Sequence, residues 1–325
     1  MAQAIVISSP GSTDVMQWKD VQLPAAAAGE VVIDIRASGV NNADILQRQG
    51  MYPVPADDSS ILGLECSGII GAVGHGVTEW SVGDKVCALL NGGGYATEVA
   101  VPAAQVLPKP EKLTFEQAAS LPEAACTVFS NIGMLARLQP GETLLMHGGT
   151  SGIGTLAIQW AKALGAHVIT TAGTPAKVIR AKEIGADVSI NYRQQDFPSA
   201  VMEATGGKGA NVIFDIVGAP YLDRNINCLA PDGRIVMIGG DVSPATLSIS
   251  ALMMKRGSIS ATTLRARDHI QKAKIVSAVH KEIWPMVEKG LIQPVIDSLV
   301  PMAQAARAHQ MLESGAAVGK VVLTV

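Results

Sequence analysis

The chain is poor in charged residues, aromatic residues and cysteine. Of its 325 residues, 16% are charged and 4% are aromatic, and the net charge is −3. With a pI of 6.1 and no run of Lys or Arg, the chain lacks the basic surface that a dedicated nucleic-acid-binding protein needs. The cysteines form no C-x-x-C pair, so we expect buried, reduced thiols in a cytoplasmic protein. They are Cys66, Cys87, Cys126 and Cys228.

Long apolar runs are absent as well. No stretch is long and apolar enough to predict a membrane span. The first residues, Met-Ala-Gln-Ala-Ile-Val-Ile, lack the basic segment and long apolar core of a signal peptide, and we expect them to form a strand. Apolar residues are nevertheless abundant. They make up 48% of the chain, which is ample for a core, and the length favours two domains.

The spacing of apolar residues changes along the chain. Up to about residue 120, short strands alternate with glycine-containing turns, and residues 30–36 show the period of two of a half-buried strand. From about 125 to 265, strands and helices alternate, which predicts a parallel, doubly wound sheet. Its strands are expected near 143–147, 167–171, 187–190, 211–217 and 233–238.

The last residues, 320–325, predict a strand that returns to the first domain. The chain is therefore expected to be an α/β protein with a discontinuous, β-rich domain of residues 1–124 and 290–325. Residues 125–289 are expected to form the doubly wound domain.

The segment His147-Gly-Gly-Thr-Ser-Gly-Ile-Gly154 lies between a predicted strand and a predicted helix. A glycine-rich turn in this context is where the pyrophosphate of a dinucleotide docks. Gly149 permits the tight turn, Gly154 lets the helix pack closely, and the backbone amides of Gly152 and Ile153 are expected to face the anion. The middle glycine of the usual motif is Ser151 here. Its hydroxyl is expected either to face the phosphate or to sit at a slightly longer approach.

The second strand of this domain ends without an acidic residue. Domains built for NAD usually carry an Asp or Glu about twenty residues past the glycines, where it accepts the ribose 2′-hydroxyl. Here no acidic residue precedes Glu183, and Gly173, Thr174 and Lys177 offer space, a hydroxyl and a cation. This pattern predicts a preference for NADP(H). The alternative is that Lys177 is an ordinary solvated lysine.

Two further strands end in residues that suit a cofactor crevice. Val217-Gly218 and Gly239-Gly240 follow the fourth and fifth strands. In an open α/β sheet the ligand lies at the carboxyl ends of the strands, so these residues are expected to meet the glycine-rich turn at one edge. The alternative is that they are ordinary loop glycines.

Motifs along the whole chain resemble those of the zinc-independent NADPH:quinone oxidoreductases of the medium-chain dehydrogenase/reductase superfamily. They lie at residues 39–53, 62–68, 82–86, 92–96, 148–154 and 319–323. Segments 121–124, 227–234 and 255–259 are most similar to the tumour-suppressor-inducible branch of that family. The resemblance implies a GroES-like catalytic domain and a Rossmann domain that binds NADPH, with an acceptor cleft between them.

The resemblance also implies that no metal is used. Zinc-using relatives carry a cysteine and a histidine at the positions held here by Asn41 and Leu64, and their structural four-cysteine cluster is missing. Without thiolate and imidazole, Zn²⁺ has no set of ligands. Cys66 beside Glu65 is interpreted as a buried core cysteine rather than a residual ligand.

By resemblance, the catalytic residues are Asn41 and Asp44, near the nicotinamide and its ribose, and Tyr52, which lines the acceptor pocket. Further cofactor contacts implied in this way are Thr127, Tyr192, Leu264, Arg265 and Lys320. Tyr192 is expected to pack on the 2′-phosphate with Lys177. The alternatives are a core aromatic at Tyr52 and a turn or helix cap at Asn41 and Asp44.

The resulting hypothesis is a metal-independent NADPH:quinone reductase that works as a homodimer, with residues 245–254 pairing as an edge between subunits. One alternative is an NADPH-dependent reductase of the activated C=C bonds of enals or enones. Another is a low-turnover NADPH-binding, RNA-binding or crystallin-like protein. His147 is interpreted as a strand-end histidine held by backbone groups rather than as an acid or base.

Overall fold

The structure is a computed structural model that describes residues 1–55 and 58–325. By their contacts these residues fall into two units. The first unit comprises Met1–Cys126, Arg265–Glu288 and Pro294–Val325, and the second comprises Thr127–Leu264 and Lys289–Gln293. Residues 265–288, which the sequence pattern assigned to the doubly wound domain, thus lie in the first unit. The reason is that helix α9 (His269–Glu282) packs on η2 (Ala103–Gln105) and strand β7 (Val106–Pro108).

The first unit is built around a seven-stranded mixed sheet with the order β14-β15-β3-β4-β5-β7, in which β6 also pairs with β3. The remaining strands of this sheet are β3 (Glu30–Gly39), β4 (Glu65–Val73), β5 (Lys85–Leu89), β6 (Glu98–Pro102), β14 (Ile296–Pro301) and β15 (Lys320–Thr324). β1 (Ala2–Ile7) and β2 (Met16–Val21) form a separate antiparallel pair.

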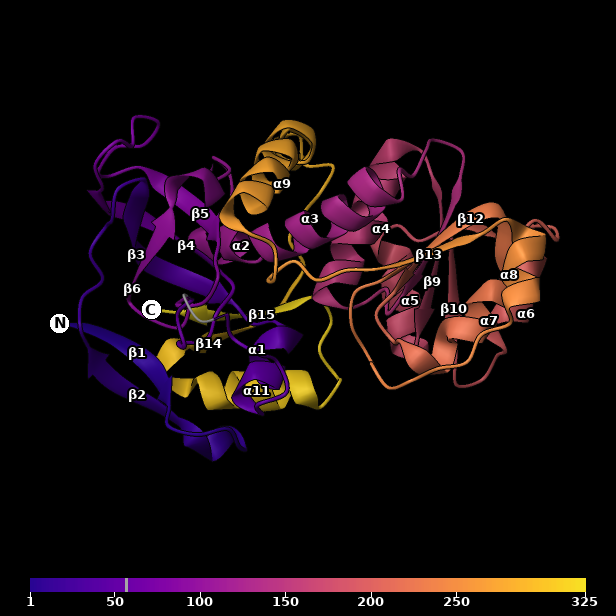
Figure 1. The fold of residues 1–325 in the computed structure, drawn as a ribbon, viewed down its shortest axis with the longest axis horizontal. Coiled ribbons are helices and arrows are strands. Elements are labelled where there is room, and N and C mark those ends of the chain that lie inside the picture. Colours follow the sequence, from indigo (N-terminus) through magenta and orange to yellow (C-terminus); the bar gives the residue numbers. More distant parts are fainter. Residues whose placement is uncertain (56–57) are drawn as a thin grey trace. The chain divides into compact units, whose positions relative to one another are not determined.

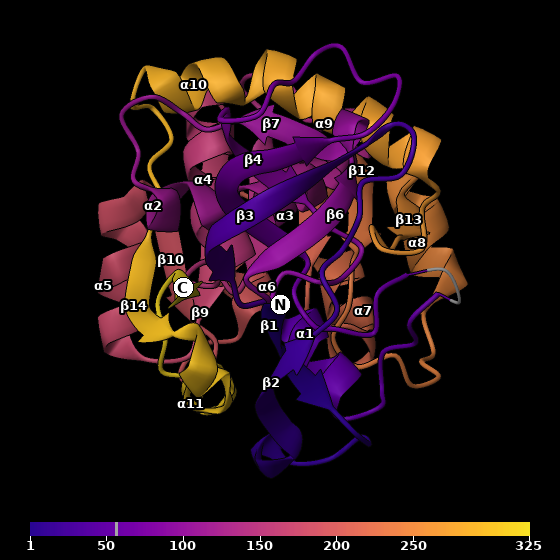
Figure 2. The ribbon, with the colours of Figure 1, turned by 90° about the vertical axis from the view of Figure 1, so that its left-hand side faces the viewer.

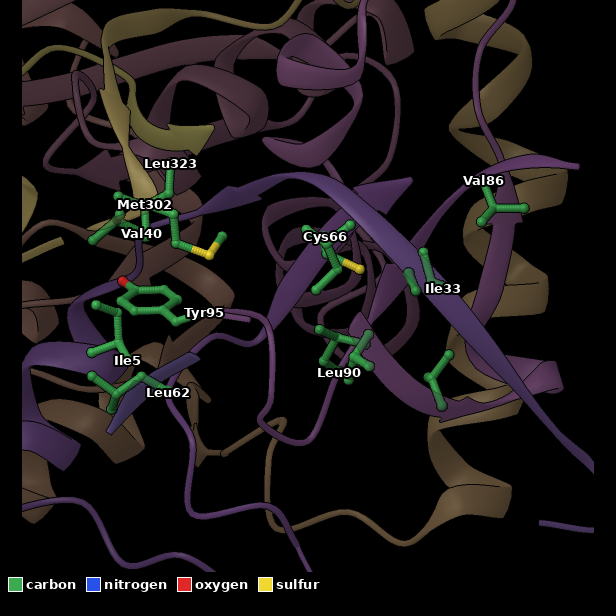
Figure 3. Packing of buried hydrophobic residues seen from close by; sticks show 14 of the residues in the cluster. Ile5, Ile33, Val40, Leu62, Cys66, Val86, Leu90, Tyr95, Met302 and Leu323 are labelled. Carbon is green, nitrogen blue, oxygen red and sulfur yellow. The ribbon is translucent and has the colours of Figure 1, made fainter. Parts of the chain in front are cut away.

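Strand β3 organises this sheet because it is paired along both edges. It lies antiparallel to β4 on one side and to β6 on the other, as Figure 2 shows, and its last residues pair with β15. Its apolar residues, with those of the neighbouring strands, form a core that includes Ile33, Cys66, Leu90 and Tyr95 (Figure 3). Burial of these side chains is what stabilises a sheet of such short strands.

Short helices complete the first unit. They are η1 (Thr13–Val15), α1 (Asn42–Arg48), α2 (Phe115–Ala119), α10 (Trp284–Glu288), η5 (Met302–Gln304) and α11 (Ala305–Glu313). α3 (Pro122–Val128) begins in the first unit and ends in the second, where the π-helix η3 (Phe129–Leu135) follows it.

The second unit is a six-stranded, fully parallel sheet with the order β10-β9-β8-β11-β12-β13. Figure 1 labels β9, β10, β12 and β13 of this sheet. Its strands are β8 (Thr143–His147), β9 (His167–Ala172), β10 (Val188–Asn191), β11 (Ala210–Asp215), β12 (Leu229–Met237) and β13 (Ser258–Ala261). The order reverses between β8 and β11, which is the point where such sheets bind ligands. Strands were predicted close to the first five positions, whereas β13 is a further edge strand.

The helices of the second unit begin at polar caps. Ser151 caps α4, Thr174 caps α5 and Asp196 caps α6, each by accepting a hydrogen bond from an amide of the first turn. α4 contacts β8 and β9 as well as α5, while α6 contacts β10 and α7. The helices are α4 (Gly152–Leu164), α5 (Pro175–Ile184), α6 (Phe197–Ala204), η4 (Ala219–Tyr221), α7 (Leu222–Asn227) and α8 (Ile249–Lys255).

The prediction that residues 245–254 pair as an edge strand is wrong. The second half of this segment is helix α8, which begins because the Ser248 side chain accepts a hydrogen bond from the amide of Ala251. The free edge on this side of the sheet is β13, which pairs only with β12 among the strands that the structure describes.

Within residues 1–55 and 58–325, no helix is long and apolar enough to cross a membrane.

Candidate functional site

The glycine-rich turn joins β8 to α4 with very close packing. A Cβ at Gly149 would lie 2.6 Å from the Cβ of Thr170, and a Cβ at Gly154 would collide with the carbonyl oxygen of Gly148. Gly148 itself has a φ of +71°, which favours glycine. The turn therefore needs these residues to bring the helix start against the strand end.

The start of α4 offers two open backbone donors. The hydroxyl of Ser151 accepts a hydrogen bond of 3.0 Å from the amide of Gly154, so it caps the helix. Within the chain that the structure describes, the amides of Gly152 and Ile153 have no hydrogen-bond acceptor. Because the positive end of the dipole of this 13-residue helix lies here, the turn fits a pyrophosphate.

Four residues predicted to face a 2′-phosphate lie together at the ends of β9 and β10. A Cβ at Gly173 would come within 2.7 Å of the hydroxyl oxygen of Tyr192, whose side chain is 39% exposed. Thr174 caps α5 by accepting from the amide of Lys177 at 3.3 Å, which places the lysine in the first turn of that helix. Gly173, Thr174, Lys177 and Tyr192 thus lie around the carboxyl ends of the paired strands β9 and β10.

The ends of β11 and β12 are joined to each other. The buried carboxylate of Asp215 accepts from the amides of Val217 at 2.6 Å and Gly218 at 3.1 Å. Asp241, directly after Gly239 and Gly240, donates its amide to the carbonyl of Val217 at 2.8 Å. The two predicted glycine-containing loops therefore form one hydrogen-bonded edge.

In the first unit, Asn41 and Asp44 form the capping box of α1. Asp44 is fully buried, and its oxygens accept from the amide of Asn41 at 2.8 Å, the amide of Gly63 at 3.0 Å and the hydroxyl of Tyr95 at 3.3 Å. Burial raises the pKa of Asp44 to about 7. Asn41 and Asp44 therefore form the helix cap that the sequence offered as an alternative, and the side chain of Asp44 is shielded from solvent.

Asn41 belongs to a buried charged cluster. The ammonium of Lys320 donates to Asn41 Oδ1 at 2.5 Å and to Glu65 Oε1 at 2.6 Å. The side-chain nitrogen Nδ2 of Asn41 donates to the same Glu65 oxygen at 2.9 Å. Burial lowers the pKa of the Lys320 ammonium, but the carboxylates of Glu65, Glu123 and Asp44 together outweigh burial, so the pKa is raised. Sequence reasoning considered Glu65 only as a metal ligand and missed this role. The glycine at position 39 is the sequence feature linked to this role, because a Cβ there would collide with the Glu65 carboxylate.

Tyr52 and Arg265 face each other within the first unit. The guanidinium carbon of Arg265 lies 5.6 Å from the centroid of the Tyr52 ring. Arg265 is 5% exposed and donates to Gln47 Oε1 at 2.6 Å and to the carbonyl of Asn91 at 2.9 Å. Burial lowers the pKa of Arg265 without displacing it from the charged state. A residue expected on the cofactor side thus contacts the residue expected on the acceptor side.

Thr127 and Leu264 lie in the second unit, Thr127 on α3 and Leu264 three residues past the carboxyl end of β13. Thr127 is buried, and its carbonyl accepts from the side-chain amide of Asn131 at 2.8 Å. Asn131, on η3, also accepts from the hydroxyl of Thr262 at 2.5 Å, so it links the segment before Leu264 to the carbonyl of Thr127.

Asn41 and Leu64, which by resemblance correspond to zinc ligands of zinc-using relatives, are both buried. Among the residues that the structure describes, no three His, Cys, Asp or Glu side chains are grouped so that they could hold a metal ion. The four cysteines are free and buried. Burial raises the pKa of each thiol, to about 12 for Cys228, so all four are protonated at neutral pH.

Two family models match the chain. "Alcohol dehydrogenase GroES-like domain" matches residues 27–111, and "Zinc-binding dehydrogenase" matches residues 152–278. A quinone oxidoreductase of Pseudomonas aeruginosa is 33% identical, and the match covers 99% of each chain. A 2-haloacrylate reductase of a Burkholderia species is 30% identical, again over 99% of each chain.

Solved structures agree with these relatives. The quinone oxidoreductase of Escherichia coli complexed with NADPH superposes with a TM-score of 0.89 at 30% identity, covering 99% of this chain and 100% of that one. The predicted α/β fold with a GroES-like and a Rossmann domain is therefore confirmed. The chain belongs to the medium-chain dehydrogenase/reductase superfamily, in the family of the quinone oxidoreductases, and is an NAD(P)-dependent oxidoreductase.

Proposed function

We propose that this protein is a metal-independent reductase that transfers a hydride from NADPH to a quinone. The observation that carries the proposal is the buried cluster of Asn41, Glu65 and Lys320. By resemblance, zinc-using relatives carry a metal ligand at the position of Asn41, and here that side chain is bonded to the Glu65–Lys320 ion pair. Oxidation of an alcohol needs a metal or strong base to stabilise the alkoxide, whereas a quinone is already electrophilic and chiefly needs to be positioned.

NADPH is favoured over NADH by the residues at the ends of β9 and β10. Lys177 and Thr174 offer a cation and a hydroxyl, and Tyr192 offers an exposed aromatic face. No Asp or Glu that could repel a 2′-phosphate lies between the end of β9 and Glu183. The open amides of Gly152 and Ile153 are proposed to bind the pyrophosphate. When bound there, the dinucleotide supplies the hydride.

On the acceptor side, we assign the hydrogen-bonding role to Tyr52 and a supporting role to Arg265. The Tyr52 phenol can donate to a quinone oxygen, and the guanidinium beside its ring favours negative charge developing on that oxygen. Lys320 and Asn41 are proposed to hold the nicotinamide end, since Lys320 has one N–H beyond the two that Asn41 and Glu65 accept. Asp44 is proposed to act through Asn41, whose backbone it holds.

A second candidate is reduction of activated C=C bonds. The 2-haloacrylate reductase is one relative, and the enoyl reductase CurK superposes with a TM-score of 0.87 at 27% identity. The test is NADPH oxidation by ortho-quinones, para-quinones and enals, compared by kcat/KM. The proposal expects a quinone to be the best acceptor. Preference for enals would establish the second candidate, and no turnover with any acceptor would favour a binding protein.

We further propose a homodimer of cytoplasmic location. β13 leaves one edge unpaired, and exposed apolar side chains lie near it in the sequence: Val242 (89%), Ile249 (62%), Met253 (70%) and Met254 (80%). An open strand edge beside such side chains favours association. The four unpaired thiols support a reducing compartment. Segments 121–124, 227–234 and 255–259 support the tumour-suppressor-inducible branch of the family.

A further inference from the structure

His147 is a fully buried residue that the proposed chemistry does not use. It ends β8, directly before the glycine-rich turn, and its ring packs edge-on against Phe197 and Tyr221 with centroid distances of 4.9 Å to each. Both ring nitrogens have polar partners: Nδ1 lies 3.1 Å from Thr171 Oγ1, and Nε2 lies 2.8 Å from Asn225 Oδ1. The sequence interpretation that backbone groups hold this histidine is therefore wrong, since side chains of β9 and α7 hold it.

The partners of His147 determine which nitrogen carries the proton. Asn225 donates from Nδ2 to the carboxylate of Asp215 at 2.8 Å, and a carboxylate oxygen only accepts, so Asn225 presents its oxygen to His147. Nε2 must therefore carry the hydrogen. Nδ1 is then an acceptor for the hydroxyl of Thr171, which in turn accepts from the amide of Gly148 at 3.3 Å.

These bonds form one continuous chain between two loops. At one end is the amide of Gly148 in the glycine-rich turn, and at the other are the amides of Val217 and Gly218, which Asp215 accepts. Between them the chain runs through side chains only, from Thr171 to His147, Asn225 and Asp215. Both loops belong to the proposed dinucleotide site.

We propose that His147, neutral and with its proton on Nε2, is a positioning residue that fixes the spacing of the glycine-rich turn and the Val217–Gly218 loop and thereby strengthens dinucleotide binding. This inference rests on the proposed cofactor site. Histidine suits the task because its two nitrogens can accept on one side and donate on the other at a fixed separation. The opposite tautomer would set two acceptors, Nε2 and Asn225 Oδ1, against each other.

The surroundings keep the ring neutral. Burial lowers the pKa of His147, the charge of Arg224 lowers it further, and the carboxylate of Asp215 opposes both. Arg224 lies over the rings of Phe197 and Tyr221, the same rings that enclose His147. A protonated ring would donate from Nδ1 to Thr171 and leave the hydroxyl hydrogen of Thr171 without its acceptor.

The first test needs no variant. In the wild-type protein labelled with ¹⁵N-histidine, a long-range proton–nitrogen correlation spectrum reports which ring nitrogen is protonated. The proposal expects His147 to be neutral and protonated at Nε2 from neutral pH to below the ordinary titration range of histidine. The resonance is assigned by its absence from His147→Gln. A proton on Nδ1, or a titration like that of an exposed histidine, would overturn the proposal.

The second test measures dinucleotide binding by fluorescence titration. His147→Gln and Thr171→Val each break the chain at a buried bond, so each should raise the dissociation constants of NADPH and NADH by the same factor, about tenfold. The dissociation constants of the double variant should exceed those of either single variant by less than about twofold, because both changes break the same series of hydrogen bonds.

The control is Val201→Ala, which removes buried methyl groups from the same unit on α6, and the valine side chain forms none of the hydrogen bonds that link Gly148 to Val217 and Gly218. It should change both dissociation constants by less than about twofold at temperatures where the protein is folded. An equal effect of this control, or additive effects of the two chain variants, would mean that general loosening is responsible and would overturn the proposal. If the wild type bound neither dinucleotide, the proposed function would fail together with it.

Discussion

Lys177 carries the most specific expectation at the scale of single residues. A charge-assisted hydrogen bond contributes about 1.5–3 kcal/mol, so Lys177→Ala should raise the dissociation constant of NADPH by at least about tenfold. NADH has no 2′-phosphate and should change by less than about threefold. Fluorescence titration at fixed ionic strength measures both, since salt screens exposed charges.

The matched control for Lys177 is Arg180→Ala on the same helix. Arg180 is exposed and pairs with Glu183 at 2.9 Å, so its loss should leave both affinities within about twofold. Equal weakening of NADPH and NADH by Lys177→Ala, or a wild-type preference for NADH, would contradict the assignment of NADPH.

A variant of Tyr52 tests whether this residue contacts the quinone or the cofactor. Tyr52→Phe keeps the ring against Arg265 and removes only the hydroxyl, so kcat/KM for quinone should fall by roughly 3- to 10-fold, the loss of one neutral hydrogen bond. The dissociation constant of NADPH should stay unchanged, and titration beside steady-state kinetics shows whether it does. Weaker NADPH binding would move Tyr52 to the cofactor side.

In the proposed cofactor site, local conformation was more predictable than side-chain partners. The tight turn at Gly149 and Gly154 and the helix start at Lys177 were predicted from local sequence, because a turn or a helix start depends on neighbours in the chain. The Glu65–Lys320 pair and the contacts of His147 did not, because they join residues that are far apart in the sequence. The spacing of apolar residues does not indicate which two buried charged side chains will form an ion pair.

At the scale of elements, the start of α4 can be tested through Ser151. The hydroxyl of Ser151 caps the helix, so Ser151→Ala should lower the free energy of unfolding by about 1 kcal/mol, measured by denaturant titration. NADPH affinity should change by less than about threefold, because the proposed phosphate donors are backbone amides. Ser248→Ala, which removes the same kind of cap from α8, is the control for stability. A large loss of affinity with unchanged stability would show that the hydroxyl faces the phosphate instead.

Elements with several large apolar residues were predicted well. β8 occupies the residues expected from its apolar run, and its glycine-rich turn follows directly. β10 and β13 are both four residues long, but β10 contains Val188 and Ile190 and was predicted, whereas β13 contains one large apolar residue, Ile259, and was missed. The alternation in residues 245–250 imitated a strand, but the Ser248 cap and the methionines after it form the helix α8.

At the scale of the whole molecule, the proposed dimer makes a direct prediction. Sedimentation at micromolar concentration should show a dimer, and Met254→Glu should shift it toward monomer, because a charge would be buried in the interface. Leu299→Glu, at a similarly exposed apolar side chain on β14, should leave the dimer intact. A monomeric wild type, or equal effects of the two variants, would contradict the proposed interface.

The sequence pattern predicted one boundary between the two units but not the unit to which α9 belongs. The alternation of strands and helices marked the start of the second unit within a few residues of Thr127. It did not reveal that α9 packs with η2 and β7, because a helix pattern tells which face is apolar but not which surface covers it.

Hydride transfer from NADPH to a quinone is proposed to need no metal in this protein. The most direct measurement is quinone-dependent NADPH oxidation by protein dialysed against a chelator, with the zinc content of the same sample determined by elemental analysis. Because Asn41 and Leu64 stand where a catalytic ion would need ligands, we expect full activity with well below one zinc per chain. Stoichiometric zinc in the undialysed protein, lost together with the activity and restored with it, would contradict the account.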